Sequence, residues 1–189
     1  MRLIFLGPPG AGKGTQASIL ANSLGILHIS TGELLRKERK DKTKRGVEAQ
    51  SYIDQGALVP DRIVMEIVQE QLTKPEAQAG WILDGFPRNV SQAGALDELL
   101  IGLSQKSCDC AVSFDVPESV LVERLKKRGR MDDTAEVLRN RLKIYHEETA
   151  PLIDFYSDRQ ILEIINGFVS REGVTGALKE VIEDLKKII

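Results

Sequence analysis

Residues 7–15, GPPGAGKGT, constrain the fold of this 189-residue chain more than any other segment. They lie directly between an apolar run at residues 3–6 and a helical pattern at residues 16–24. Glycines let the backbone turn successive N–H groups inward around an anion, and the positive end of a following helix adds to that attraction. This order predicts a strand, a phosphate-binding loop and a helix, with Lys13 as a mobile positive charge at the phosphates.

Further apolar runs follow the first, and helical patterns separate them. The runs show little period-two alternation, which is typical of strands buried on both faces of a parallel sheet. Alternating strands and helices predict an α/β domain with a five-stranded parallel sheet flanked by helices, whose ligands gather at the carboxyl ends of the strands. The expected strands are residues 3–6, 26–29, 81–83, 111–116 and 161–165.

Two segments interrupt this alternation within one expected domain, residues 1–189. Residues 30–59 are mostly polar with a helical pattern, and they separate the second expected strand from the next core helix. We expect them to form an inserted flap. Residues 127–133, KRGRMDD, form a short charged connection between two helical patterns.

The composition limits the kinds of partner that the protein is expected to bind and the cellular compartment in which it is expected to lie. The formal net charge of −2 argues against a general nucleic-acid or membrane-surface binder. No stretch approaches the roughly twenty apolar residues of a membrane span, and the first apolar run is too short for a secretion signal. Cys108 and Cys110 are too close in sequence for an easy disulfide, and we expect reduced thiols at the start of a buried strand. We therefore expect a cytoplasmic monomer that acts on small molecules.

Residues 84–88, DGFPR, carry the second chemical signal. Asp84 follows a buried apolar run, and an aspartate at the carboxyl end of a strand can hold Mg²⁺ through water. A turn-capping aspartate is the alternative interpretation, but the phosphate loop elsewhere in the chain favours the metal role. Thr15 can offer its hydroxyl to a phosphate or to Mg²⁺.

Three stretches together resemble the adenylate kinase family: residues 7–16, residues 28–36 (HISTGELLR) and residues 84–88. Residues 56–61 and 145–152 are similar to that family too, so the resemblance covers nearly the whole chain. Gly14 separates Lys13 from Thr15, which departs from the usual phosphate loop and is typical of nucleoside monophosphate kinases. Two features differ from the family pattern: Glu33 stands where aspartate is usual, and the short lid leaves no room for a zinc-binding insert.

The resemblance implies the P-loop nucleoside kinase fold, with residues 30–59 as the NMP-binding flap and residues 127–133 as the lid. It implies Mg²⁺ with ATP as the cofactor, no zinc, and Asp84 as the residue that reaches Mg²⁺ through water. It implies that the catalytic residues are Lys13, Arg88, Arg130 and Arg141. It implies that ATP is bound by Gly10, Ala11, Gly12, Lys13, Gly14, Thr15, Arg124 and Arg128. It implies that AMP is bound by Thr31, Arg36, Ala57, Leu58, Val59, Gly85, Phe86, Pro87, Arg88, Gln92, Arg130 and Arg141.

The arginine set fits this chemistry on physical grounds. Phosphoryl transfer needs alignment and charge stabilisation, and the planar guanidinium binds phosphate at two points while staying charged. Arg124 and Arg128 are four residues apart, so one helix face carries both. Arg141 lies beside an apolar stripe, where an unpaired cation is costly, so we expect it to have an anionic partner.

The predicted activity is reversible in-line transfer of the terminal phosphoryl group of ATP to AMP, giving two ADP. A UMP/CMP kinase is one alternative, against which Thr31 argues because the pyrimidine enzymes tend to have alanine there. A non-catalytic ATP-binding switch is an alternative of another class. The arginine set argues against a switch, because such a protein has little need for a second phosphate pocket.

Overall fold

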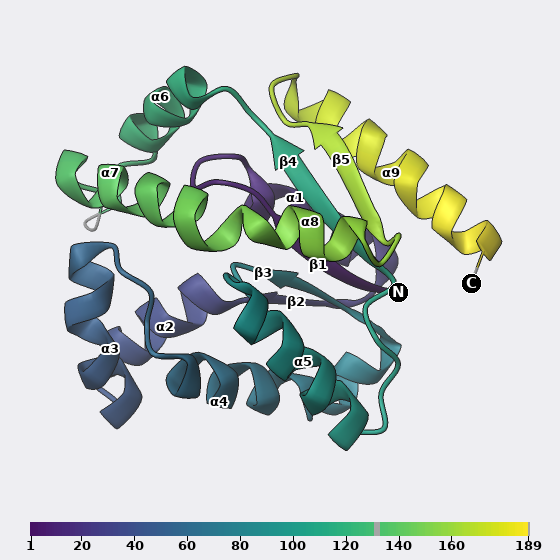
Figure 1. The fold of residues 1–189 in the computed structure, drawn as a ribbon, viewed down its shortest axis with the longest axis horizontal. Coiled ribbons are helices and arrows are strands. Elements are labelled where there is room, and N and C mark those ends of the chain that lie inside the picture. The colour runs from purple at the N-terminus through teal and green to yellow at the C-terminus, as the bar shows by residue number, and fades with distance from the viewer. Residues whose placement is uncertain (131–132, 189) are drawn as a thin grey trace.

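A computed structural model of the chain describes residues 1–130 and 133–188, and these residues form a sheet of five parallel strands (Figure 1). The order across the sheet is β2–β3–β1–β4–β5. The predicted α/β class and parallel sheet are confirmed, and each strand lies within one residue of its expected apolar run. The strands are β1 (Arg2–Leu6), β2 (Leu27–Ser30), β3 (Trp81–Asp84), β4 (Cys110–Asp115) and β5 (Leu162–Asn166).

Helices cover both faces of the sheet, which explains why the strands are apolar at successive positions. Ile4 and Leu6 of β1 join one hydrophobic cluster, and Leu3 and Phe5 join another on the opposite face. The helices are α1 (Lys13–Leu24), α2 (Thr31–Lys40), α3 (Lys44–Gln55), α4 (Asp61–Leu72), α5 (Val90–Gly102), α6 (Glu118–Arg128), α7 (Ala135–Ile144), α8 (Pro151–Ser157) and α9 (Arg171–Ile188).

Strand order fixes where the phosphate loop lies. β1 is the central strand, paired with β3 on one side and β4 on the other. Phe5 is in register with Asp84, and Leu6 with Ser113, so the loop after β1 emerges between the carboxyl ends of these neighbours. In an open parallel sheet, this is the position where ligands bind.

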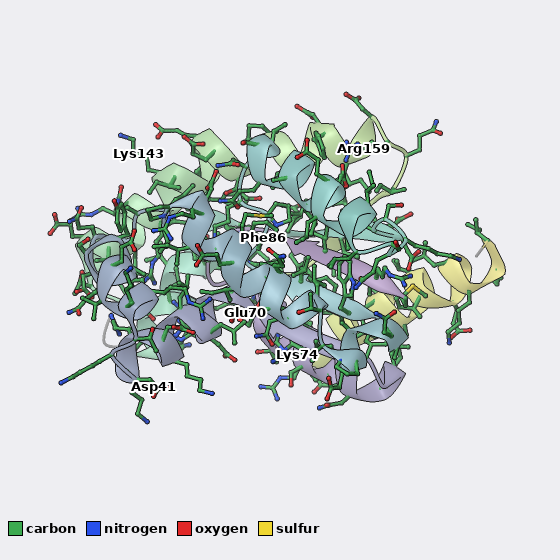
Figure 2. The ribbon with its side chains drawn as sticks, turned by 90° about the horizontal axis from the view of Figure 1, so that it is seen from below. Asp41, Glu70, Lys74, Phe86, Lys143 and Arg159 are labelled. Atoms are coloured by element: carbon green, nitrogen blue, oxygen red, sulfur yellow. The ribbon has the colours of Figure 1, made fainter. Side chains whose placement is uncertain are left out.

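The expected insert at residues 30–59 contains α2 and α3, which pack against each other. Asp41 lies at the outer end of this pair (Figure 2). Gly46 is required where the helices cross, because a side chain there would collide with the Glu38 carbonyl group. The Arg45 guanidinium contacts the Glu70 carboxylate at 2.6 Å and thereby ties α3 to α4.

The segment from α6 to α8 contains two helical elements that the sequence did not predict. α6 ends at Arg128, and Gly129 has a φ of 62°, the left-handed conformation that glycine favours after a helix. Residues 131 and 132 of the expected lid lie outside the described residues. A π-helical turn, η2 (Tyr145–Thr149), and α8 then continue α7 as one helical rod (Figure 1). A short 3₁₀ helix, η1 (Pro75–Ala79), precedes β3.

Cys108 and Cys110 are free buried thiols that belong to the clusters on opposite faces of the sheet, so they cannot form a disulfide with each other. Burial raises the pKa of both thiols, that of Cys110 to about 12, and both therefore stay protonated.

Within residues 1–130 and 133–188, no helix has the length and apolar character needed to span a membrane.

Candidate active site

A cleft of about 920 Å³ runs along the carboxyl edge of the sheet. The phosphate loop forms its floor, and the start of α2 together with the residues after α3 forms one wall. The end of α6, helix α7 and the loop after β5 also contribute lining residues. Segments far apart in the sequence therefore meet at the place predicted from the strand order.

The phosphate loop is held in shape by its own glycines and lysine. Gly10 and Gly12 have φ values of 90° and 95°, which other residues adopt only with strain. The Lys13 Nζ donates hydrogen bonds to the carbonyl oxygens of Gly7 at 2.7 Å and Pro8 at 3.0 Å. The side chain thus folds back over the loop and points its charge into the cleft.

The surroundings of Lys13 disfavour its protonated form. Burial above all, together with the charges of Arg88 and Arg128, lowers its pKa to about 8, although the charge of Asp84 acts in the opposite direction. The negative charge around the protonated lysine is therefore too small to offset its burial and the neighbouring arginines. A phosphate placed on the loop would supply that charge and favour the protonated lysine.

Asp84 lies at the end of β3 with 9% of its surface exposed. Burial alone would raise its pKa, but His28 at 3.8 Å and the charges of Lys13 and Arg88 outweigh it and hold the pKa below its usual range. A side chain at position 14 would place its Cβ 3.1 Å from the Asp84 Oδ2 atom. Gly14 therefore lets an ionised carboxylate lie against the loop, which explains the departure from the usual loop sequence.

The Asp84 carboxylate fits a Mg²⁺ site in which the protein and the bound substrate both supply ligands. Mg²⁺ binds oxygen ligands and usually combines one or two carboxylates with water and substrate phosphates. Among the described residues, no group of three or more His, Cys, Asp or Glu side chains could hold a metal by itself. An ion at Asp84 would consequently depend on the phosphates of a bound nucleotide.

Guanidinium groups from different elements converge on the cleft. Arg36 comes from α2, Arg88 follows β3, and Arg141 comes from α7; Arg128 and Arg130 lie at the end of α6 and just beyond it. Burial, and then the neighbouring charge of Arg141, lower the pKa of Arg88, while Asp84 opposes this effect. Like charges held close together in a partly dry cleft form a strong site for a phosphate.

Asp133 supplies the anion for two of these arginines. Its side chain is only 2% exposed. It accepts hydrogen bonds from the Arg128 Nε and Nη2 atoms at 2.8 and 2.6 Å, and from the Arg141 Nη1 atom at 3.0 Å. Burial would raise the pKa of Asp133, but Arg128 and Arg141 hold it below its usual range. Asp133 is thus an anionic partner of the kind expected for Arg141.

The sequence reasoning did not single out Asp133 as a site residue. The signal that could have found it was a pair of aspartates at residues 132–133, close in sequence to Arg128 and Arg130. Aspartates beside a cluster of arginines are expected to pair with them rather than simply to face solvent, because buried guanidinium groups require an anion.

Gln92 lies on the opposite side of the cleft with both ends of its amide engaged. Its Oε1 accepts from the Arg88 N–H at 2.8 Å, and its Nε2 donates to the Asp61 Oδ1 at 2.6 Å. An amide oxygen accepts two hydrogen bonds and an amide nitrogen donates two, so each end can still bind one more group. Gln92 can therefore position Arg88 and contact a ligand at the same time.

The cleft brings together all but one of the residues predicted for the site. Phe86 differs, because its side chain is fully buried in the core beneath the cleft (Figure 2). An apolar ring gains more from that packing than from a polar cleft. The residues that line the cleft as expected are Gly10, Ala11, Gly12, Lys13, Gly14, Thr15, Thr31, Arg36, Ala57, Leu58, Val59, Asp84, Gly85, Pro87, Arg88, Gln92, Arg124, Arg128, Arg130 and Arg141.

The loop after β5 also lines the cleft and was not predicted to do so. Gly167, Val169 and Arg171 form this part of the wall. The Arg124 Nη1 donates to the Gly167 carbonyl oxygen at 3.0 Å, so this loop holds an arginine that was expected to bind ATP. The rule that ligands gather at the carboxyl ends of strands applies to β5 as well and pointed to these residues.

The chain matches known proteins along almost its whole length. A model of the adenylate kinase family matches residues 5–161. The chain is 58% identical to adenylate kinase 1 of Nostoc sp. over 178 residues, which cover 94% of this chain and 96% of the relative. It is 47% identical to adenylate kinase 1 of Synechocystis sp. over 181 residues, or 96% of each. It is 54% identical to adenylate kinase of Mycobacterium tuberculosis over 159 residues, covering 84% of this chain and 87% of the relative. The chain therefore belongs to the adenylate kinase family.

Proposed function

We propose that this nucleoside monophosphate kinase transfers the terminal phosphoryl group of Mg·ATP to AMP and forms two ADP molecules. One observation supports this most: a phosphate loop and a cluster of arginines share a single cleft. A loop with Lys13 suits the phosphates of the donor. The cluster that includes Arg36, Arg88 and Arg141 suits the phosphate of an acceptor.

On the donor side, the backbone of residues 10–15 surrounds the ATP phosphates, while Lys13 neutralises their charge. Arg124 stacks on the adenine ring and Arg128 reaches a phosphate. Mg²⁺ bound with ATP would offset the charge of the phosphates. Asp84 would hold this ion through water, and Thr15, which also lines the cleft, would offer its hydroxyl.

On the acceptor side, Thr31 and residues 57–59 contact AMP, with Gln92 reading an edge of adenine. Arg36 and Arg88 bind the AMP phosphate. Arg130 and Arg141 reach the moving group from the other side of the cleft, where they stabilise charge as it spreads over the equatorial oxygens. The enzyme supplies alignment and electrostatic stabilisation, without a phosphoenzyme.

Water must be kept from the moving group, because otherwise ATP is hydrolysed. We assign this task to residues 30–59 as a flap over AMP and residues 127–133 as a short lid over ATP. The Arg130 Nη2 lies 4.0 Å from the Glu33 Oε1, so the two segments already approach each other across the cleft.

The decisive test is a coupled assay for ADP made from ATP, Mg²⁺ and AMP. We expect ADP formation that requires AMP. Replacing AMP by CMP or UMP tests the pyrimidine alternative, and ATP binding without AMP-dependent ADP formation would instead indicate a switch. The comparisons give neither alternative any support over the adenylate kinase assignment.

We further assign the enzyme to the cytoplasm, as a monomer that acts on small molecules without nucleic acid or membrane. Its net charge of −2 and its buried free thiols support this assignment. Light scattering should give a mass near the 20.9 kDa of one chain. A mass of twice that value would contradict the monomer.

A further inference from the structure

Arg88 is fixed by three hydrogen bonds among the described residues, and one of them reaches it from a distant part of the chain. Its N–H donates to the Gln92 Oε1 at 2.8 Å, and its Nε donates to the Gly85 carbonyl oxygen at 2.8 Å. Both partners belong to its own segment. The third bond comes from Thr149, 61 residues away, whose Oγ1 donates to the Arg88 carbonyl oxygen at 2.7 Å.

Holding Arg88 in this position costs free energy, which such hydrogen bonds offset. The Arg88 side chain is partly buried, and the charge of Arg141 repels it. Arg88 also lies in the irregular connection between β3 and α5, outside any regular backbone ladder. A hydrogen bond from a rigid helical rod can hold this segment in place while the cleft contains no phosphate.

The π-helical turn η2 brings the Thr149 hydroxyl to Arg88. The Ala150 N–H donates to the Tyr145 carbonyl oxygen at 2.8 Å, five residues earlier. A π turn contains one residue more than an α-helical turn, and each residue rotates the following side chains by about 100°. The turn therefore decides which side chain faces Arg88. Such turns occur frequently at functional sites.

The same rod carries Arg141, one of the cations facing Arg88 across the cleft. α7, η2 and α8 run on without interruption (Figure 1), so Thr149 fastens the Arg88 backbone to the element that positions Arg141. The Thr149 hydroxyl has only one proton, which the Arg88 carbonyl accepts. Its part in the reaction is consequently to position another residue.

We propose that Thr149 is a positioning residue for phosphoryl transfer, whose hydroxyl sets the separation of Arg88 and Arg141 so that both can contact one phosphate. This inference rests on the proposed function in one respect, the assignment of Arg88 to the acceptor phosphate. Losing the hydroxyl should leave the donor site intact and weaken use of the acceptor.

The test compares Thr149→Val with Thr149→Ser. Valine keeps the shape and removes the hydroxyl, whereas serine keeps the hydroxyl. We expect kcat/KM for AMP to fall about two- to tenfold in Thr149→Val, the range for one hydrogen bond. KM for ATP and the melting temperature should stay near wild-type values, and Thr149→Ser should retain wild-type kinetics. If the valine variant does not fold, Thr149→Ala removes the same hydroxyl with a smaller side chain.

Thr73→Val is the matched control, because the Thr73 hydroxyl also donates to backbone carbonyls, at 3.0 and 3.1 Å, but at the end of α4 away from the cleft. It should leave kcat/KM for AMP unchanged. Wild-type kinetics in Thr149→Val, or an equal loss in Thr149→Ser, would overturn the proposal.

A readout independent of activity separates this proposal from the proposed function. The Arg88 Nε–H, which donates to the Gly85 carbonyl oxygen, gives a side-chain NMR signal protected from exchange. We expect faster exchange in nucleotide-free Thr149→Val and no change in Thr149→Ser. An unchanged signal in Thr149→Val contradicts the positioning role. A wild-type enzyme that makes no ADP from ATP and AMP contradicts the proposed function instead.

Discussion

The phosphate loop and the arginine cluster are both proposed to bind phosphate, but the chain builds them in opposite ways. The loop is one contiguous segment, and Lys13 is held by carbonyl oxygens of the loop itself. The cluster draws on separate elements, and residues that bind no substrate hold it in place. Asp133 holds Arg128 and Arg141, and Thr149 holds Arg88.

This difference predicts how each region fails. A loop that depends on itself is damaged by changes within it and is tolerant of changes elsewhere. A cluster assembled from distant parts can be damaged from positions that never touch a nucleotide, by smaller amounts at each position. The following variants test this contrast from the largest expected effect to the smallest.

Lys13→Met should cause the largest loss. The variant removes the cation that we propose for the donor phosphates, and we expect kcat to fall about a thousandfold, as for loss of a main charge-stabilising donor. The fold should persist, because the change removes a buried charge whose pKa of about 8 shows that burial disfavours it. Steady-state kinetics and a thermal scan check both points. A kcat within tenfold of wild type would mean that the loop does not hold the donor.

Arg88→Lys should cause a smaller loss that is confined to the acceptor. Lysine keeps the positive charge but lacks the planar fork that binds phosphate at two points. We expect kcat/KM for AMP to fall about a hundredfold, within the range for loss of one stabilising donor, with KM for ATP nearly unchanged. Kinetics with each substrate varied in turn measure this. Equal losses for both substrates would remove the distinction between the two regions.

Asp133→Asn tests whether the cluster needs its internal anion. The variant leaves Arg128 and Arg141 without the carboxylate between them, and we expect about 2 kcal/mol less stability, roughly thirtyfold in the unfolding equilibrium constant. Because the pKa of Asp133 is lowered in the folded protein, the carboxylate stabilises the fold above the usual aspartate pKa, and this contribution disappears as pH falls through the folded value.

Urea unfolding of both proteins at a series of pH values measures this difference. The wild type should be the more stable protein at pH 7, and the two should converge at acidic pH. A constant difference across the whole series would show that the charge of Asp133 contributes nothing.

Asn140→Asp should give the smallest effect. The Asn140 Nδ2 donates to the Gln55 carbonyl oxygen at 2.7 Å, at the end of α3 and just before the cleft residues 57–59. Aspartate cannot donate this bond, and its charge repels the negative end of the helix. We expect KM for AMP to rise about two- to fivefold with kcat unchanged. Arg139→Ala, the exposed neighbour on α7, is the control. A rise in KM for ATP alone would contradict the expectation.

The sequence predicted the loop better than the cluster for the same physical reason. The strand, loop and helix around Lys13 are neighbours in the chain, so their pattern is visible locally. Likewise, residues 3–6 of β1 are buried on both faces and therefore appear as a continuous apolar run. Such signals do not require knowledge of the tertiary structure.

The residues that hold the arginine cluster in place give no such local signal in the sequence. Nothing local in the sequence shows that Thr149 meets a carbonyl group 61 residues away, or that Asp133 lies between two particular arginines. The resemblance named Arg88 and Arg141 without saying what holds them. Phe86 illustrates the reverse case, because its motif predicts a site residue while its apolar ring packs in the core.

A crystal structure with AMP and a non-hydrolysable ATP analogue bound together tests the central claim most directly. The two phosphate chains should meet in one cleft, with Lys13 on the donor phosphates and with Arg88 and Arg141 within hydrogen-bonding distance of the acceptor phosphate. Phosphates bound in separate places, or Arg88 and Arg141 facing solvent while AMP is bound, would contradict it.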